Sequence, residues 1–160
     1  MDMLSRHAAR AALLAWAGLV SAPCSASDAA PAPAPRAAAD EGMPGYAERV
    51  MNAVNAYRIE KGLPALVQTP ELAALAAEHS RDMAGRKRPS HEGFAQRFDR
   101  TGAELCVENV AHGFRVPEQV LAGWRRVTTH HRNLLEPRVR YVGMASSGLY
   151  VTYFACDTPR

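Results

Sequence analysis

The fold is constrained above all by the order of two sequence patterns: helical spacing comes first along the chain, and strand patterns come last. Over most of residues 44–130, apolar side chains recur at the spacing of helices that bury one face. Near the C-terminus, two runs rich in β-branched and aromatic residues, 139–145 and 149–155, flank the turn sequence Ser146-Ser147-Gly148 and predict a hairpin. Helices followed by strands indicate an α+β domain with a mainly antiparallel sheet, and they argue against a repeated βαβ unit.

The N-terminal 43 residues are expected to lie outside this domain. Residues 1–27 have the parts of a secretory signal: Arg6 and Arg10, then an apolar run over 11–20, then small residues that suit cleavage. The run is too short to span a bilayer, so a retained transmembrane helix is the weaker alternative, and no anchor is expected after signal removal. Residues 28–43 are an Ala/Pro-rich linker. Residues 44–160, about 115 in number, then form one domain with one core.

The three cysteines are divided by the expected cleavage. Cys24 lies in the signal segment, where lipid attachment is an alternative that Pro23 disfavours. Cys106 and Cys156 remain, and an even pair in an exported protein is expected to form a disulfide rather than two reactive thiols. Closing a loop of about 50 residues should stabilise the fold by about 4 kcal/mol in the chain-entropy model.

Three helices are predicted before residue 103. The first ends at residues 61–64 and buries one face, formed by Tyr46, Val50, Val54 and Tyr57. Thr69 caps the second, with Pro70 at its first position, and its inner face consists of Leu72, Leu75, Ala76, His79 and Met83. His79 is therefore interpreted as a core histidine rather than a ligand. After a loop over residues 89–93, a short helix places Phe94 and Phe98 inward and stops at Gly102.

The segment that carries His130 follows a short strand. Residues 103–111 have no helical stripe and predict a strand that contains Glu108 and runs into a turn. Residues 117–128 predict a helix that buries Trp124 and delivers His130 at its C-terminal end. A histidine after a helix is more often a C-terminal cap than a functional group, so its role depends on its neighbours.

Composition and missing motifs exclude several functions. The chain is 48% hydrophobic and 22% charged, as in ordinary globular proteins. It has no phosphate-binding glycine loop, serine-hydrolase elbow, HExxH zinc motif or haem CxxCH. Its 19 basic and 16 acidic residues become 17 and 15 once the signal is removed, and this balance indicates no nucleic-acid partner. Basic clusters at residues 86–88 and 125–126 could face anionic groups or simply be solvated helix faces.

Five motifs in a fixed order suggest a family. They are NAYRIEKGLPAL with the helix AALAAEHSRDMA, then SHEGF, then ENVAHG, then Trp124 through HHRNLLEP, and finally YVGMA. Each is weak alone, but together, over about residues 50–154, they resemble the CAP superfamily, a bacterial-type SCP domain. This fold is shared by cysteine-rich secretory proteins, venom allergen 5 and plant pathogenesis-related 1 proteins.

The resemblance implies a three-layer α/β/α sandwich and an extracytoplasmic location, secreted or periplasmic. It also implies a surface cleft lined by His91, Glu108 and His130. The family histidine lies six residues after a tryptophan and three before an asparagine, and only His130 meets both conditions; His131 does not. A second glutamate of some family members falls at Val127, and Val107 replaces a usual glycine.

Two imidazoles and one carboxylate form a plausible three-ligand zinc set that leaves a position open for water. Hydrolysis would also need a general base, and Glu92 and Glu118 are the nearest candidates by sequence. Alternatively, the three residues hydrogen-bond one another and hold the loops together. We therefore expect a binding module for a lipid, an envelope component or a protein, with a zinc-dependent hydrolase or protease as the alternative.

Overall fold

The structure is a computed structural model that describes residues 43–158. The predicted signal, the alternative lipidation at Cys24 and the linker up to residue 42 lie outside the described residues. Within the described part, no helix is both long enough and apolar enough to cross a membrane.

One four-stranded sheet organises the described residues. Its strand order is β1-β3-β4-β2, with β1 parallel to β3 and the other neighbours antiparallel. The helices are α1 (Tyr46–Glu60), α2 (Pro70–Arg86), α3 (Phe94–Thr101), α4 (Pro117–Arg126) and α5 (Thr128–Leu134). The strands are β1 (Val67–Gln68), β2 (Cys106–His112), β3 (Tyr141–Ser147) and β4 (Tyr150–Cys156). The sheet is mainly antiparallel, as predicted.

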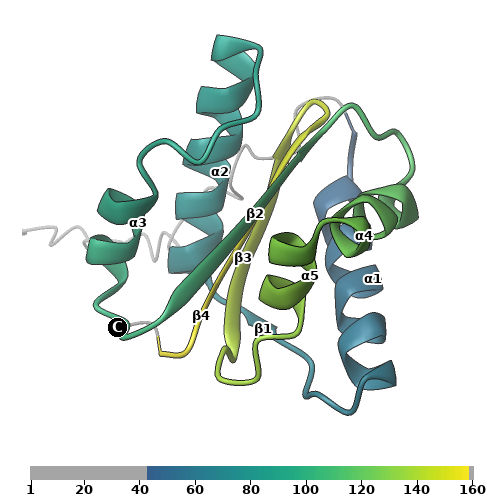
Figure 1. The fold of residues 1–160 in the computed structure, drawn as a ribbon. Coiled ribbons are helices and arrows are strands. Elements are labelled where there is room, and N and C mark those ends of the chain that lie inside the picture. Colours follow the sequence, from purple (N-terminus) through teal and green to yellow (C-terminus); the bar gives the residue numbers. More distant parts are fainter. Residues whose placement is uncertain (1–42, 159–160) are drawn as a thin grey trace, which may run out of the picture. The chain divides into compact units, whose positions relative to one another are not determined.

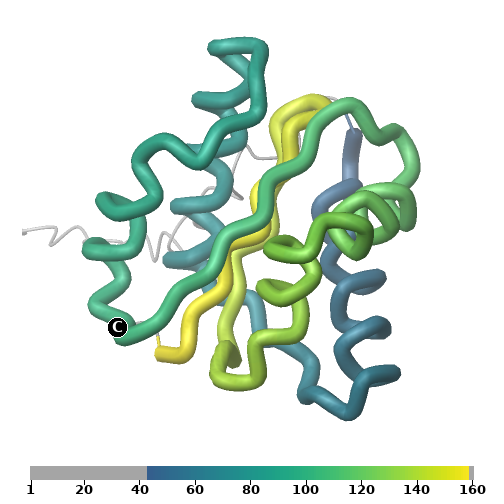
Figure 2. Tube along the Cα trace, viewed as in Figure 1, coloured from purple at the N-terminus to yellow at the C-terminus, as the bar shows by residue number. Residues whose placement is uncertain are grey.

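Helices cover both faces of this sheet. Helices α2 and α3 lie on one side, and α1, α4 and α5 lie on the other (Figures 1 and 2). Successive side chains of β4 point to opposite faces of the sheet and pack against the helices on each side. Tyr153 packs in the cluster that contains Val50 and Trp124, whereas Phe154 packs with Leu72 and Leu75. The result is the α/β/α sandwich that the resemblance implied.

The backbone of α2 lies directly on β3 at Gly143. A Cβ atom added to Gly143 would lie 1.9 Å from the carbonyl oxygen of Leu72, far inside van der Waals contact. Only glycine allows this approach. The contact fixes the depth at which the first turn of α2 sits on the sheet.

The start of α2 and the end of α3 lie where the sequence predicts, whereas α2 continues one residue beyond the predicted end at Gly85, to Arg86. The Thr69 hydroxyl accepts a hydrogen bond from the Leu72 amide (3.3 Å), and Pro70 is the first residue of α2. Gly102 ends α3 in the left-handed conformation, with φ of 64°. The disulfide is also confirmed: Cys106 and Cys156 are joined, and they face each other across β2 and β4.

The prediction of one helix over residues 117–128 was wrong. Helix α4 ends at Arg126, Val127 is extended (φ −103°, ψ 117°), and a separate helix α5 begins at Thr128. His130 therefore lies inside α5 rather than at the end of the Trp124 helix. A β-branched residue tolerates this extended break, and the break lets both helices reach β2.

The strands differ from the prediction in three places. Strand β1 was not predicted, because its two exposed residues carry no alternating pattern. Strand β2 continues to His112, beyond the turn expected after residue 111, because it pairs with β4 along its whole length. In the hairpin, Ser146 and Ser147 belong to β3, so the turn lies at residues 148–149.

Candidate functional site

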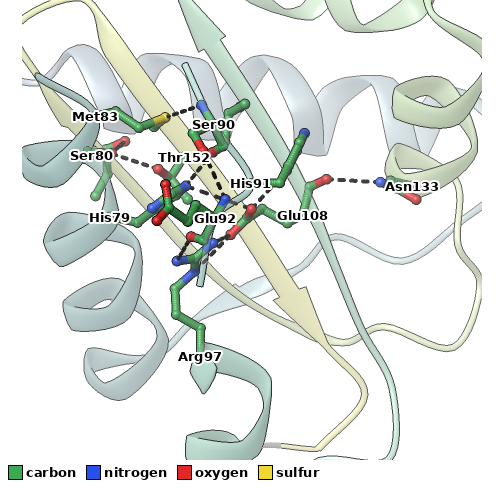
Figure 3. A network of polar contacts seen from close by, with 12 residues as sticks. His79, Ser80, Met83, Ser90, His91, Glu92, Arg97, Glu108, Asn133 and Thr152 are labelled. Atoms are coloured by element: carbon green, nitrogen blue, oxygen red, sulfur yellow. Dashed lines mark hydrogen bonds and ion pairs between the residues drawn. The ribbon is translucent and has the colours of Figure 1, made fainter. Parts of the chain in front are cut away.

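The structure brings the three predicted site residues together around β2. His91 comes from the loop between α2 and α3, Glu108 from β2, and His130 from α5. His91 Nδ1 lies 2.9 Å from Glu108 Oε1 (Figure 3), and the ring centroids of His91 and His130 are 6.1 Å apart. His91 thus lies between Glu108 and His130, and the cavities on its two sides are together called the cleft here.

Arg97 of α3 neutralises Glu108. Its Nε and Nη2 atoms donate to Glu108 Oε2 at 2.9 and 2.6 Å, and its Nη1 donates to the Glu92 carbonyl (Figure 3). Both side chains are buried, with Arg97 7% and Glu108 5% exposed. Because His91 occupies Oε1 and Arg97 occupies Oε2, both carboxylate oxygens already have partners.

Sequence reasoning missed Arg97, although a signal for it was present. Arg97 lies between Phe94 and Phe98, the two inward residues of α3, and so shares their helix face. An arginine on the buried face of a short helix needs a buried acidic partner. Glu108 is that partner.

His79 supports the same network from α2. It is 3% exposed, and its Nε2 donates to the Ser90 carbonyl at 2.7 Å, which fixes the loop that carries His91. Burial lowers the pKa of His79, while the nearby Glu108 carboxylate opposes the shift. His79 is therefore a satisfied core histidine, as the sequence predicted.

Helices α4 and α5, which form the His130 side of the cleft, are attached to β2 by hydrogen bonds. Trp124 Nε1 donates to the Val110 carbonyl (2.9 Å), and Asn133 Nδ2 donates to the Glu108 carbonyl (3.0 Å). Asn109 Nδ2 in turn donates to the His130 carbonyl (3.0 Å). The spacing of tryptophan, histidine and asparagine therefore has a structural reason, because these residues connect α4 and α5 to successive residues of β2.

The two adjacent histidines of α5 have different surroundings. His130 faces His91, and its pKa is lowered first by burial and then by the neighbouring His91. His131 instead makes a hydrogen bond of 2.7 Å between its Nε2 and the Tyr57 hydroxyl of α1. The residue count to Trp124 and Asn133 thus selects the histidine that lines the cleft.

Two cavities flank His91. One, of about 480 Å³, is mostly apolar and is called here the apolar groove; its main lining residues are His91, Val110, Ala111, His112, Phe114, Trp124, Val127 and His130. The other, of about 290 Å³, lies beside Glu108, Phe94 and Asn133. Val127 is 44% exposed at the rim of the apolar groove, so the place of a second glutamate is taken by an apolar side chain.

The arrangement does not fit a three-ligand zinc site. Among residues 43–158, no three His, Cys, Asp or Glu side chains cluster in a way that could hold a metal. Zinc would have to displace Arg97 or His91 to reach an oxygen of Glu108. The carboxylate of Glu92 is engaged by Arg86 at 2.6 Å, and Glu118 lines neither cavity. Zinc binding in the cleft therefore stays a prediction.

With the fold and the cleft described, the family can be stated. The pattern of the Cysteine-rich secretory protein family (CAP) matches residues 51–157, which is most of the described chain. The chain belongs to this family.

Similar proteins come from several bacteria. Protein YkwD of Bacillus subtilis is 27% identical over 106 residues, which cover 62% of this chain and 41% of YkwD. An extracellular SCP-domain protein from Bacillus anthracis has a TM-score of 0.66 and 25% identity, covering 70% of this chain and 40% of that one. An outer surface protein from Borrelia burgdorferi shares the fold, with a TM-score of 0.63 and 15% identity over 73% of this chain and 95% of that one. The chain thus spans about two fifths of the length of the two Bacillus proteins.

Proposed function

We propose that this chain acts outside the cytoplasm as a binding module that holds a small apolar or lipid-like ligand in the apolar groove. The proposal rests on the difference between the surroundings of Glu108 and the apolar groove. Glu108 is buried and fully engaged, whereas the groove beside it is open and lined mainly by apolar side chains. Concave, largely apolar surfaces with a few polar groups are typical of small-ligand sites. An apolar part of an envelope component or of a partner protein would fit the same chemistry.

The proposed location rests on the predicted signal and on the relatives. Two of the similar proteins are described as extracellular or outer-surface proteins. Intact-mass analysis of protein from the native host should give a chain that begins near Ser27 or Asp28. Retention of Met1 in cytoplasmic protein would contradict export, and the added mass of a lipid on Cys24 would establish a lipoprotein instead.

A zinc-dependent hydrolase or protease is the second candidate function. It is favoured by the closeness of His91 and His130 and by the burial that lowers the pKa of His130, since a ligating imidazole must be neutral. Both oxygens of Glu108 are engaged, and among residues 43–158 no other carboxylate lines either cavity beside His91, which favours the binding module.

Two valines provide a matched test of the binding groove. Val127 and Val116 are both 44% exposed, both precede a helix in an extended conformation, and neither makes a side-chain cap hydrogen bond. Aspartate is a good N-cap residue, so it should suit the helix start at either position. Only Val127 lines the apolar groove.

The test is a titration of each variant with a fluorescent fatty-acid probe. Val127→Asp should weaken probe binding about tenfold or more, because it places a charge in an apolar site. Val116→Asp should bind the probe as the wild type does. Equal affinities in all three proteins, or equal losses in both variants, would contradict the assignment of the groove.

A further inference from the structure

A further pocket lies between α1, α4 and α5, apart from the two cavities that flank His91. It has a volume of about 370 Å³ and is lined by Tyr57, Ala122, Arg125, Arg126 and His131. It shares no lining residue with the apolar groove. No carboxylate lines it, so its charge is positive, and it is called here the cationic pocket.

Tyr57 gives this pocket a fixed wall. The residue is 4% exposed, and its hydroxyl is held by His131 Nε2 at 2.7 Å. The guanidinium carbon of Arg125 lies 4.5 Å from the centroid of the Tyr57 ring, within the range of a cation–π contact. Lys61 Nζ lies 5.3 Å from the same centroid. The ring therefore holds Arg125 in place without neutralising its charge.

The arginines of the pocket lack anionic partners in the described chain. Within residues 43–158, neither Arg125 nor Arg126 forms an ion pair or a side-chain hydrogen bond. The pKa of Glu60 is lowered chiefly by its hydrogen bond and ion pair with Lys61 at 2.8 Å, and only to a smaller extent by Arg125. Two guanidinium groups thus remain available to a ligand.

The other basic cluster of the chain behaves differently. Arg86 pairs with Asp82 (2.9 Å) and Glu92 (2.6 Å), and Arg88 reaches Glu92 at 3.5 Å. Both arginines of that cluster pair with neighbouring carboxylates, whereas the arginines of the cationic pocket have no such pairs in the described chain. Positive charge is favourable in the last turn of a helix, which accounts for basic residues at the end of α4. It does not account for the stacked Arg125 or for a cavity between the arginines and His131.

We infer that the cationic pocket binds an oxyanion of the phosphate type. Guanidinium forks pair with the oxygens of such groups through two parallel hydrogen bonds, and the imidazole of His131 adds a further polar group at the wall. The phosphate can belong to a free phosphate ester or to a lipid headgroup. This site does not depend on the ligand of the apolar groove.

The test is a titration with inorganic phosphate, followed by amide chemical shifts in the full mature chain. Saturable shifts are expected around Tyr57, Arg125 and His131. Arg126→Gln should lower the phosphate affinity about tenfold, because it removes a charged hydrogen-bond donor. It should leave the melting temperature unchanged, since Arg126 makes no ion pair or side-chain hydrogen bond in the described chain. Arg86→Gln is the matched control and should keep the wild-type affinity.

Vesicles distinguish the two sources of phosphate. Phosphatidic acid vesicles that bind the wild type, but bind Arg126→Gln more weakly, assign the pocket to a headgroup. Binding of inorganic phosphate without vesicle binding assigns it to a free phosphate ester. Shifts that do not saturate, equal losses in Arg126→Gln and Arg86→Gln, or vesicle binding that is insensitive to Arg126→Gln would each overturn the inference.

Discussion

The wall of the cleft built by α2 and α3 and the wall built by α4 and α5 both attach to β2, but they present different chemistry to the space between them. On the α2–α3 side, Glu108, Arg97 and His79 are buried and hydrogen-bonded to one another or to the backbone. On the α4–α5 side, polar contacts go to the strand backbone, and apolar groups such as Val127 face the cavity. The charged residue that marks the site in the sequence therefore braces one wall, and the other wall offers the binding surface.

The largest expected effect comes from separating α2 from the sheet. Gly143→Ala puts a Cβ atom 1.9 Å from the Leu72 carbonyl oxygen, so α2 must move away from β3. We expect a loss of about 4 kcal/mol or more in the free energy of unfolding, measured by urea denaturation. Gly85→Ala is the control on the same helix. Its Cβ meets no atom within 4 Å, so this change should stabilise α2 by about 0.5–1 kcal/mol. A mild effect of Gly143→Ala would show that the α2 contact is adjustable.

Removing the disulfide should affect the fold while sparing the groove. Cys156→Ala opens a loop that spans a sequence separation of 50 residues and should lower stability by about 4 kcal/mol in the chain-entropy model. The fatty-acid probe should still bind at temperatures where the variant is folded. Non-reducing peptide mapping checks the bond itself, and free thiols at both positions in protein purified without reductant would contradict it.

Removing the buried ion pair between Arg97 and Glu108 should lower the free energy of unfolding by about 3 kcal/mol near neutral pH. Arg97→Met leaves the buried carboxylate of Glu108 without its cation, and an uncompensated buried charge is strongly destabilising. The double variant Arg97→Met with Glu108→Leu removes both charges and should recover most of the loss. Additive losses in this double-mutant cycle would mean that Arg97 and Glu108 are not coupled, and that their ion pair does not stabilise the fold.

The smallest expected effect on stability is a dependence on pH. Burial lowers the pKa of His79 in the folded state, so the unfolded chain takes up the proton first as the pH falls below about 6.5. The stability is therefore complete above that pH and declines as the pH drops toward the folded-state pKa, by at most about 1.4 kcal/mol per pH unit. His79→Gln keeps an N–H donor for the Ser90 carbonyl and should flatten this slope in urea titrations between pH values of about 7 and 5. An unchanged slope would mean that His79 titrates as it does in the unfolded chain.

The features of the fold that were predicted from the sequence have local signals. The buried faces of α1, α2 and α3 follow from spacing, the start of α2 follows from Thr69, and the end of α3 follows from Gly102. The disulfide follows from the cysteine count. The break at Val127 and strand β1 could not be predicted in this way, because both depend on contacts with distant residues of the sheet.

The site was only half predicted. The motifs named His91, Glu108 and His130, and the count to Trp124 and Asn133 separated His130 from His131. Arg97 went unnoticed, because an arginine in a short polar helix resembles a solvent-exposed residue until its position between two inward phenylalanines is considered. If Arg97 is overlooked, Glu108 is interpreted as a free metal ligand. Once Arg97 is included, Glu108 is a paired, buried carboxylate.

Zinc calorimetry tests whether Glu108 is a buried, paired residue or a metal ligand. Because Arg97 and His91 occupy both oxygens of Glu108, we expect no saturating one-equivalent isotherm for the wild type at micromolar protein concentration, and no rise of its melting temperature with zinc. Any weak binding by the two imidazoles should disappear in His130→Ala and persist in His131→Ala. A one-equivalent zinc site that raises the melting temperature and is lost in both His130→Ala and Glu108→Gln would instead show that Glu108 exchanges Arg97 for the metal and is a ligand.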